Sequence, residues 1–125
     1  MKTTYLKNKL LEHLTGKTTY TKPTATYIGL LTDDPTVSGD NTAEVYGGSY
    51  ARQQVTWSTA ANGLIKNSAL ITFPAMPSGT IKYWGVYDAA TNGNLLEYFP
   101  FEVPMIITAG LTPSIDANNL ILREA

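Results

Sequence analysis

The chain has 125 residues, which is the length of one ordinary domain and is enough to bury a core without covalent staples. It contains no cysteine, and this excludes disulfides and thiolate metal sites. The 9 basic residues are balanced by 10 acidic ones, so the sequence lacks the basic excess that neutralises nucleic-acid phosphates. Neither a signal peptide nor an apolar run of membrane-spanning length is visible. We therefore expect a chain made in a cytoplasm, with no nucleic-acid or membrane partner.

The apolar pattern predicts an amphipathic helix over residues 1–16. Thr3 or Thr4 is suited to cap its start, and Gly16 is suited to end it. Four leucines fall on one arc at the helical period: Leu6, Leu10, Leu11 and Leu14. That arc carries too much apolar surface for an isolated helix. We expect it to pack across one end of the following domain or against a neighbouring chain.

From residue 26 onward the period changes to that of short β-strands. The first strand is predicted at residues 27–31, and it ends before Pro35 because proline cannot continue a central ladder. Residues 36–48 form a polar loop, and its length is typical of functional loops. Residues 50–58 alternate in the manner of a half-buried strand.

Two Asn-Gly pairs predict hairpins, because this dipeptide favours a type I′ turn. The first, Asn62-Gly63, leads into a return strand over residues 64–73. The second, Asn92-Gly93, follows a strand at residues 81–87 that is apolar on both faces and therefore central. The return strand of this second hairpin is predicted at residues 95–101.

Pro100 and Pro104 confine the second return strand to a sheet edge or a bulge. Residues 105–108 and 120–122 are the last strand candidates and bring the count to about seven or eight. So many short strands behind one helix predict a mainly β chain with a single β-sandwich, of jelly-roll or immunoglobulin-like type. The sandwich is expected to span residues 26–123 of a single domain, 1–125.

Candidates for catalysis and metal binding are few. His13 is the one histidine, and it lies at the margin of the leucine arc, where boundary packing is favoured over a role as base or ligand. Four carboxylates lie in or near the long loop: Asp33, Asp34, Asp40 and Glu44. Calcium binding and acid–base catalysis are the alternatives to a solvated loop opened by an aspartate turn. We expect no catalytic residue, no metal and no cofactor, and hence a protein that is not an enzyme.

Aromatic residues gather on two predicted partner strands: Tyr83, Trp84, Tyr87, Tyr98 and Phe99. Cross-strand core packing is the favoured interpretation of this cluster. A protein interface or a sugar-stacking platform is the alternative, because one face of a strand that is apolar on both sides must be covered by something.

Several segments occur in an order that resembles a family of small virion proteins of tailed bacteriophages. They are residues 27–35 (YIGLLTDDP), 47–53 (GGSYARQ), 67–69 (NSA) with 71–75 (ITFPA), and 86–96 (VYDAATNGNLL). Members of this family are described as phage structural, head-decoration or tail-fibre proteins. The resemblance runs from the helix to about Leu96 and brings no catalytic residue with it.

The resemblance implies a virion protein, synthesised in the cytoplasm of a bacterial host. The leading hypothesis is a capsid decoration (cement) protein that binds the outer face of the major capsid lattice and stabilises the head. The alternative is a tail-fibre or baseplate component that attaches to the host surface. The expected partners are the major capsid protein or other virion proteins, together with further copies of this chain, a trimer included.

The side chains predicted to contact such a partner are Arg52, Tyr50, Asp40, Glu44, Tyr5 and Leu10. Arg52 is the first choice, because it follows the long loop and arginine is enriched at interface hot spots. An intradomain hydrogen bond from Arg52 to a loop carbonyl is the structural alternative. A carbohydrate-active enzyme that uses the loop carboxylates is a third, minor hypothesis.

Overall fold

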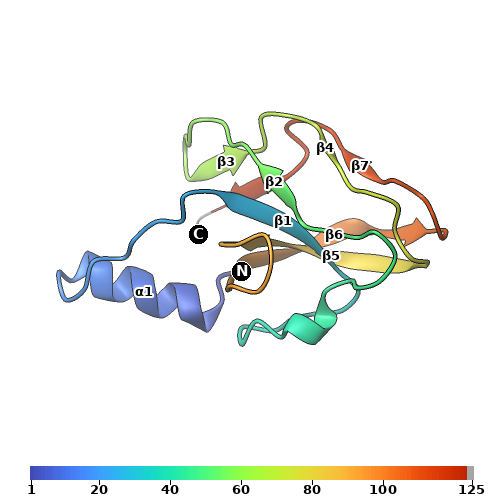
Figure 1. The fold of residues 1–125 in the computed structure, drawn as a ribbon. Coiled ribbons are helices and arrows are strands. Elements are labelled where there is room, and N and C mark those ends of the chain that lie inside the picture. Colours follow the sequence, from blue (N-terminus) through green and yellow to red (C-terminus); the bar gives the residue numbers. More distant parts are fainter. Residues whose placement is uncertain (124–125) are drawn as a thin grey trace.

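Eight antiparallel strands follow one N-terminal helix in the computed structural model, which describes residues 1–123 (Figure 1). The predicted mainly β class, with a β-sandwich behind one helix, is confirmed. The elements are α1 Thr4–Leu14, β1 Thr26–Leu31, the short 3-10 helix η1 Asn41–Ala43, β2 Gln53–Val55, β3 Leu64–Lys66, β4 Ile71–Thr72, β5 Gly79–Tyr87, β6 Leu95–Ile107, β7 Ser114–Ile115 and β8 Ile121–Arg123.

The largest sheet has the strand order β2-β1-β5-β6, and two small sheets pair β3 with β8 and β4 with β7. The core lies between them, because Ile28 and Trp84 of the large sheet share one buried cluster with Ile71 and Ile115 of the β4-β7 pair. The central position predicted for the strand at residues 81–87 is confirmed, since β5 has a neighbour on each side. Hydrophobic burial in this layer is the main stabilising contribution to the sandwich.

Helix α1 is anchored to the sandwich by its first turn. Thr3 caps the helix by accepting a hydrogen bond from the Leu6 amide, and its hydroxyl donates to the Leu95 carbonyl of β6 at 2.7 Å. Gly16 follows the helix with φ 76°, the left-handed conformation of a helix-ending glycine. Both predicted helix signals are therefore confirmed. Within α1, Leu6 alone is buried, and the helix extends beyond the strands on one side (Figure 1).

Of the two arrangements expected for the leucine face, packing across one end of the β domain is found for Leu6 but not for the other three leucines. Leu10, Leu11 and Leu14 are exposed by 36%, 59% and 82%. Geometry explains the difference, because only the first turn of α1 is held against β6. The other arrangement expected for this face, contact with a neighbouring chain, stays a prediction.

Two predicted strands have different bounds in the structure. The strand expected at residues 64–73 is divided at Asn67, which is fully buried and bonds through its side chain to the Asp116 carbonyl and the Leu120 amide. The strands expected at 95–101 and 105–108 are one, β6, with a register shift opposite Ile81 and Tyr83 of β5. Both prolines of β6 lie on the edge strand of the sheet, as predicted.

The Asn62-Gly63 turn is confirmed in detail. Both residues have positive φ, 54° and 74°, and Ala61 and Leu64 exchange two backbone hydrogen bonds of 2.9 Å across it. These are the properties of a type I′ hairpin turn. The strand that leads to it is shorter than predicted, since only Gln53–Val55 are in β2. The residues before β2 form a turn in which the Tyr50 amide donates to the Gly47 carbonyl.

Candidate functional site

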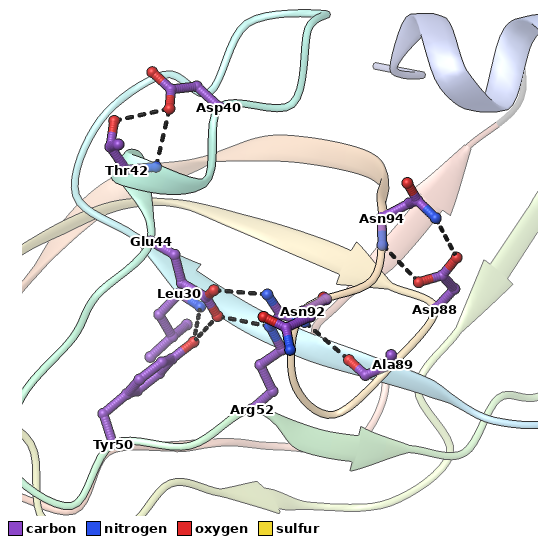
Figure 2. Close-up of polar contacts among 10 residues, drawn as sticks. All are labelled: Leu30, Asp40, Thr42, Glu44, Tyr50, Arg52, Asp88, Ala89, Asn92 and Asn94. Atoms are coloured by element: carbon purple, nitrogen blue, oxygen red, sulfur yellow. Dashed lines mark hydrogen bonds and ion pairs between the residues drawn. The ribbon is translucent and has the colours of Figure 1, made fainter.

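The six predicted contact residues fall into two groups. Glu44, Tyr50 and Arg52 meet in a polar cluster beside β1, which we call the Arg52 network (Figure 2). The remaining three, Asp40, Tyr5 and Leu10, are exposed at the surface, Asp40 before η1 and the other two on α1.

An ion pair forms the centre of the Arg52 network. Arg52 donates from Nε to Glu44 Oε2 and from Nη2 to Glu44 Oε1, each at 2.8 Å. This forked geometry is the strongest that an arginine and a carboxylate form. The Arg52 side chain is only 6% exposed and that of Glu44 13%. Burial alone would lower the pKa of Arg52, but the hydrogen bonds and charge of Glu44 raise it above its ordinary value.

Arg52 also holds the loop between β5 and β6. Its Nη1 donates to the carbonyls of Ala89 and Asn92 at 2.9 and 2.7 Å. That loop is shaped locally, because the Asp88 carboxylate accepts from the Asn94 amide at 2.7 Å and from its side chain at 3.1 Å (Figure 2). The intradomain contact to loop carbonyls, one of the two interpretations of Arg52, is therefore confirmed.

Tyr50 closes a gap in the β1 ladder. Its hydroxyl accepts from the Leu30 amide at 3.0 Å and donates to Glu44 Oε2 at 2.7 Å. The Leu30 carbonyl, in turn, accepts from the Val45 amide, so the loop after η1 runs along the same edge of β1. Burial, followed by the negative charge of Glu44, raises the pKa of Tyr50 far above the ordinary tyrosine value.

Tyr87 of β5 packs against the Arg52 network. The Arg52 guanidinium lies 3.6 Å from the centre of the Tyr87 ring, a cation–π contact. The ring is fully buried, and its hydroxyl has no hydrogen-bond partner among the described residues. Burial and the charge of Glu44 raise the pKa of this tyrosine as well.

These two tyrosines give a matched pair of deletions. Tyr50→Phe is expected to cost about 1–3 kcal/mol, because it leaves the Leu30 amide without this acceptor and removes one of the two hydrogen bonds to Glu44 Oε2. Tyr87→Phe removes the same atom but breaks no hydrogen bond and removes a buried hydroxyl that lacks a partner, so it should be neutral or stabilising. Urea unfolding of both variants checks this, and equal losses would contradict it.

Alkaline pH should destabilise the domain. Tyr50 and Tyr87 have raised pKa values in the folded protein, so above the ordinary tyrosine pKa of about 10 the unfolded chain loses protons that the folded one keeps. Their contribution to stability is complete below about pH 10 and is lost as the pH rises further. Thermal unfolding followed from pH 8 to pH 12 should show a falling midpoint that falls less steeply in Tyr50→Phe.

The loop carboxylates serve local structure. Asp40 caps η1 by accepting from the Thr42 amide at 2.9 Å, and this hydrogen bond lowers the pKa of Asp40. Asp33 and Asp34 accept from backbone amides of the next turn, at Asp34 and Thr36. Among residues 1–123, no three acidic or histidine side chains are grouped closely enough to hold a metal ion. His13 accepts through Nδ1 from the Tyr20 amide at the exposed end of the helix.

The aromatic cluster is mostly core. Trp84 stacks on Phe99 across β5 and β6 with 5.0 Å between ring centres, and Tyr83 meets Tyr98 at 6.3 Å. Trp84 and Tyr98 are buried, whereas Phe99 is half-buried and faces a groove beside β6. This groove was not predicted, because the sequence carries no sign of which strands would leave β6 uncovered.

Within the described part of the chain, no helix is long and apolar enough to cross a membrane. Comparison with family models matches residues 1–123 to the family described as Podophage GP4 fiber I protein gp80. No curated protein matches the chain.

Proposed function

Because this chain belongs to the Podophage GP4 fiber I protein gp80 family, we propose that it is a non-catalytic structural subunit of a phage fibre. The observation that carries the proposal is the extent of the match, which covers residues 1–123 and hence the helix and the entire sandwich. The family is one of phage fibre-type virion proteins, so the chain is a virion component. The resemblance seen in the sequence is confirmed at that level.

The use of polar groups supports a structural role. The most organised polar cluster, the Arg52 network, joins three loops of one domain, and its charges are paired with each other. A catalytic carboxylate needs access to a substrate, whereas Glu44 is largely buried and held by Arg52 and Tyr50. The network therefore fixes the shape of a surface, which is what a repeated structural subunit requires.

Localisation in the virion is the direct test. We expect cryo-EM of a phage that carries this chain to show the β-sandwich in fibres attached to the tail. The capsid decoration hypothesis places the same density on the outer face of the head lattice. Density on the head, with none in a fibre, would therefore overturn the proposal in favour of that hypothesis.

Loss of the gene gives an independent readout. Particles without a fibre subunit should adsorb poorly to host cells while their heads retain DNA under heating as well as those of the parent phage. Particles without a cement protein should show the reverse, with normal adsorption and heads that leak DNA. Complementation with the chain from a plasmid is the control for both measurements.

A further inference from the structure

Helix α1 has an exposed apolar ridge that no described residue covers. The ridge consists of Leu10, Leu11 and Leu14, which are exposed by 36%, 59% and 82%. Lys7 lies on the same side of the helix, one turn before Leu11 and Leu10. We call these four residues the leucine ridge. Three exposed leucines on one helix face, next to a well-buried core, form the kind of apolar surface that marks protein contact sites.

The same molecule carries a groove of about 660 Å³ along the edge strand β6, between this strand and residues 114–123. Its apolar lining includes Phe99, Phe101 and Val103, and Val103 is 79% exposed. We call this hollow the β6 groove. Its volume lies within the range of about 300–1,000 Å³ that suits an inserted ligand or a row of side chains.

The β6 groove is suited to side chains rather than to an added strand. Pro100 and Pro104 lie in this part of β6, and each removes a backbone donor from the exposed edge. Extension of the sheet by a further strand is therefore disfavoured along the groove. A helix that inserts its side chains needs no backbone donors from β6, so it fits this edge better.

The charges on the two surfaces favour contact between the leucine ridge and the β6 groove over contact between two ridges. Glu102 and Asp116 line the groove with one cation, Arg123, so the described lining has an excess of one negative charge. Lys7 on the ridge makes no side-chain hydrogen bond or ion pair within residues 1–123. Two ridges packed parallel would bring Lys7 against Lys7, and two packed antiparallel would bring it against Leu14, whereas a ridge in the groove brings Lys7 towards carboxylates.

A molecule does not fill its own groove. Past Leu6 the helix extends away from the strands (Figure 1). The three exposed leucines of the ridge are not among the residues that line the β6 groove. We infer that the leucine ridge of one copy packs into the β6 groove of a second copy of this chain. Such a ridge-in-groove contact joins two different surfaces, so it builds a ring, a filament or a reciprocal pair.

Complementary variants test the inference on the full chain. The ridge variant is Leu11→Gln with Leu14→Gln, and the groove variant is Val103→Lys with Asp116→Lys. All four side chains are exposed, and far-ultraviolet circular dichroism verifies that each variant is folded. By analytical ultracentrifugation, the wild-type chain should associate with increasing concentration, and each variant should associate at least about tenfold more weakly.

The decisive sample is a mixture of the two variants. The ridge variant keeps an intact groove, and the groove variant keeps an intact ridge. The mixture should therefore form complexes that neither variant forms alone. Tyr46→Lys, an exposed aromatic side chain away from the groove, is the control and should associate as the wild type does.

Two results would overturn the inference. In one, the groove variant associates as strongly as the wild type, which means that ridges pack on ridges or that another surface is used. In the other, the wild-type chain stays monomeric up to about 1 mM. Neither result bears on the place of the chain in the virion, so a monomeric fibre subunit would leave the proposed function intact.

Discussion

Arg52→Met is expected to lower the free energy of unfolding by about 3–5 kcal/mol. The substitution leaves Glu44 largely buried with its charge unpaired, and it frees the carbonyls of Ala89 and Asn92. A domain of this size is stable by only about 5–15 kcal/mol, so the variant should lose a large share of its stability. Urea unfolding followed by tryptophan fluorescence measures the loss, because Trp84 lies in the core.

A double variant separates the lost ion pair from the lost packing. Arg52→Met with Glu44→Met removes both charges, so it should be more stable than Arg52→Met alone despite carrying one more substitution. The control is Arg123→Met, the same replacement at the exposed second arginine, with an expected change within about 0.5 kcal/mol. Equal stability of Arg52→Met and Arg123→Met would show that the network does not stabilise the fold.

Local signals account for most of the fold that was predicted. The helix caps, the Asn62-Gly63 turn and the central position of β5 depend on short-range patterns of residue type, and all are confirmed. The break at Asn67 was missed because a buried asparagine bonded to residues about 50 positions away leaves no periodic trace. Contacts between residues far apart in the chain decide where a strand is interrupted, and a single sequence does not show these contacts.

The candidate site shows the same division. The alternation predicted for residues 50–58 implies that Tyr50 and Arg52 share one face, and both side chains do bond the same residue. That partner is Glu44, which arrives through the turn at η1 and an antiparallel pairing with Leu31. Loop geometry of this kind depends on capping hydrogen bonds such as that of Asp40. The sequence therefore indicated Glu44, Tyr50 and Arg52 as candidates but did not predict that they contact one another. The exposure of Leu14 was missed because the helical period shows which residues share a face but not which of them pack against the β domain.

Gly29→Ala should destabilise the domain strongly, because it adds a methyl group directly against the network. A Cβ at Gly29 would lie 2.6 Å from the Tyr87 ring and 2.9 Å from Glu44 Oε2. Real Cβ atoms do not approach other atoms so closely, and the Tyr87 ring is fully buried, so it has little room to move. Overpacking of this kind costs about 1–3 kcal/mol, and displacement of the ion pair adds to the cost. Urea unfolding measures the loss.

The matched control lies on the neighbouring strand. A Cβ at Gly79 meets no atom within 4 Å, so Gly79→Ala should be neutral or should stabilise by up to about 1 kcal/mol. If Gly29→Ala is as mild as Gly79→Ala, the network tolerates displacement and does not hold the loops. Gly29→Ala and Arg52→Met act on one set of contacts, so together they should cost less than the sum of their separate effects. Strict additivity would mean that Gly29 is required for packing against Tyr87 alone, and that the ion pair adjusts independently.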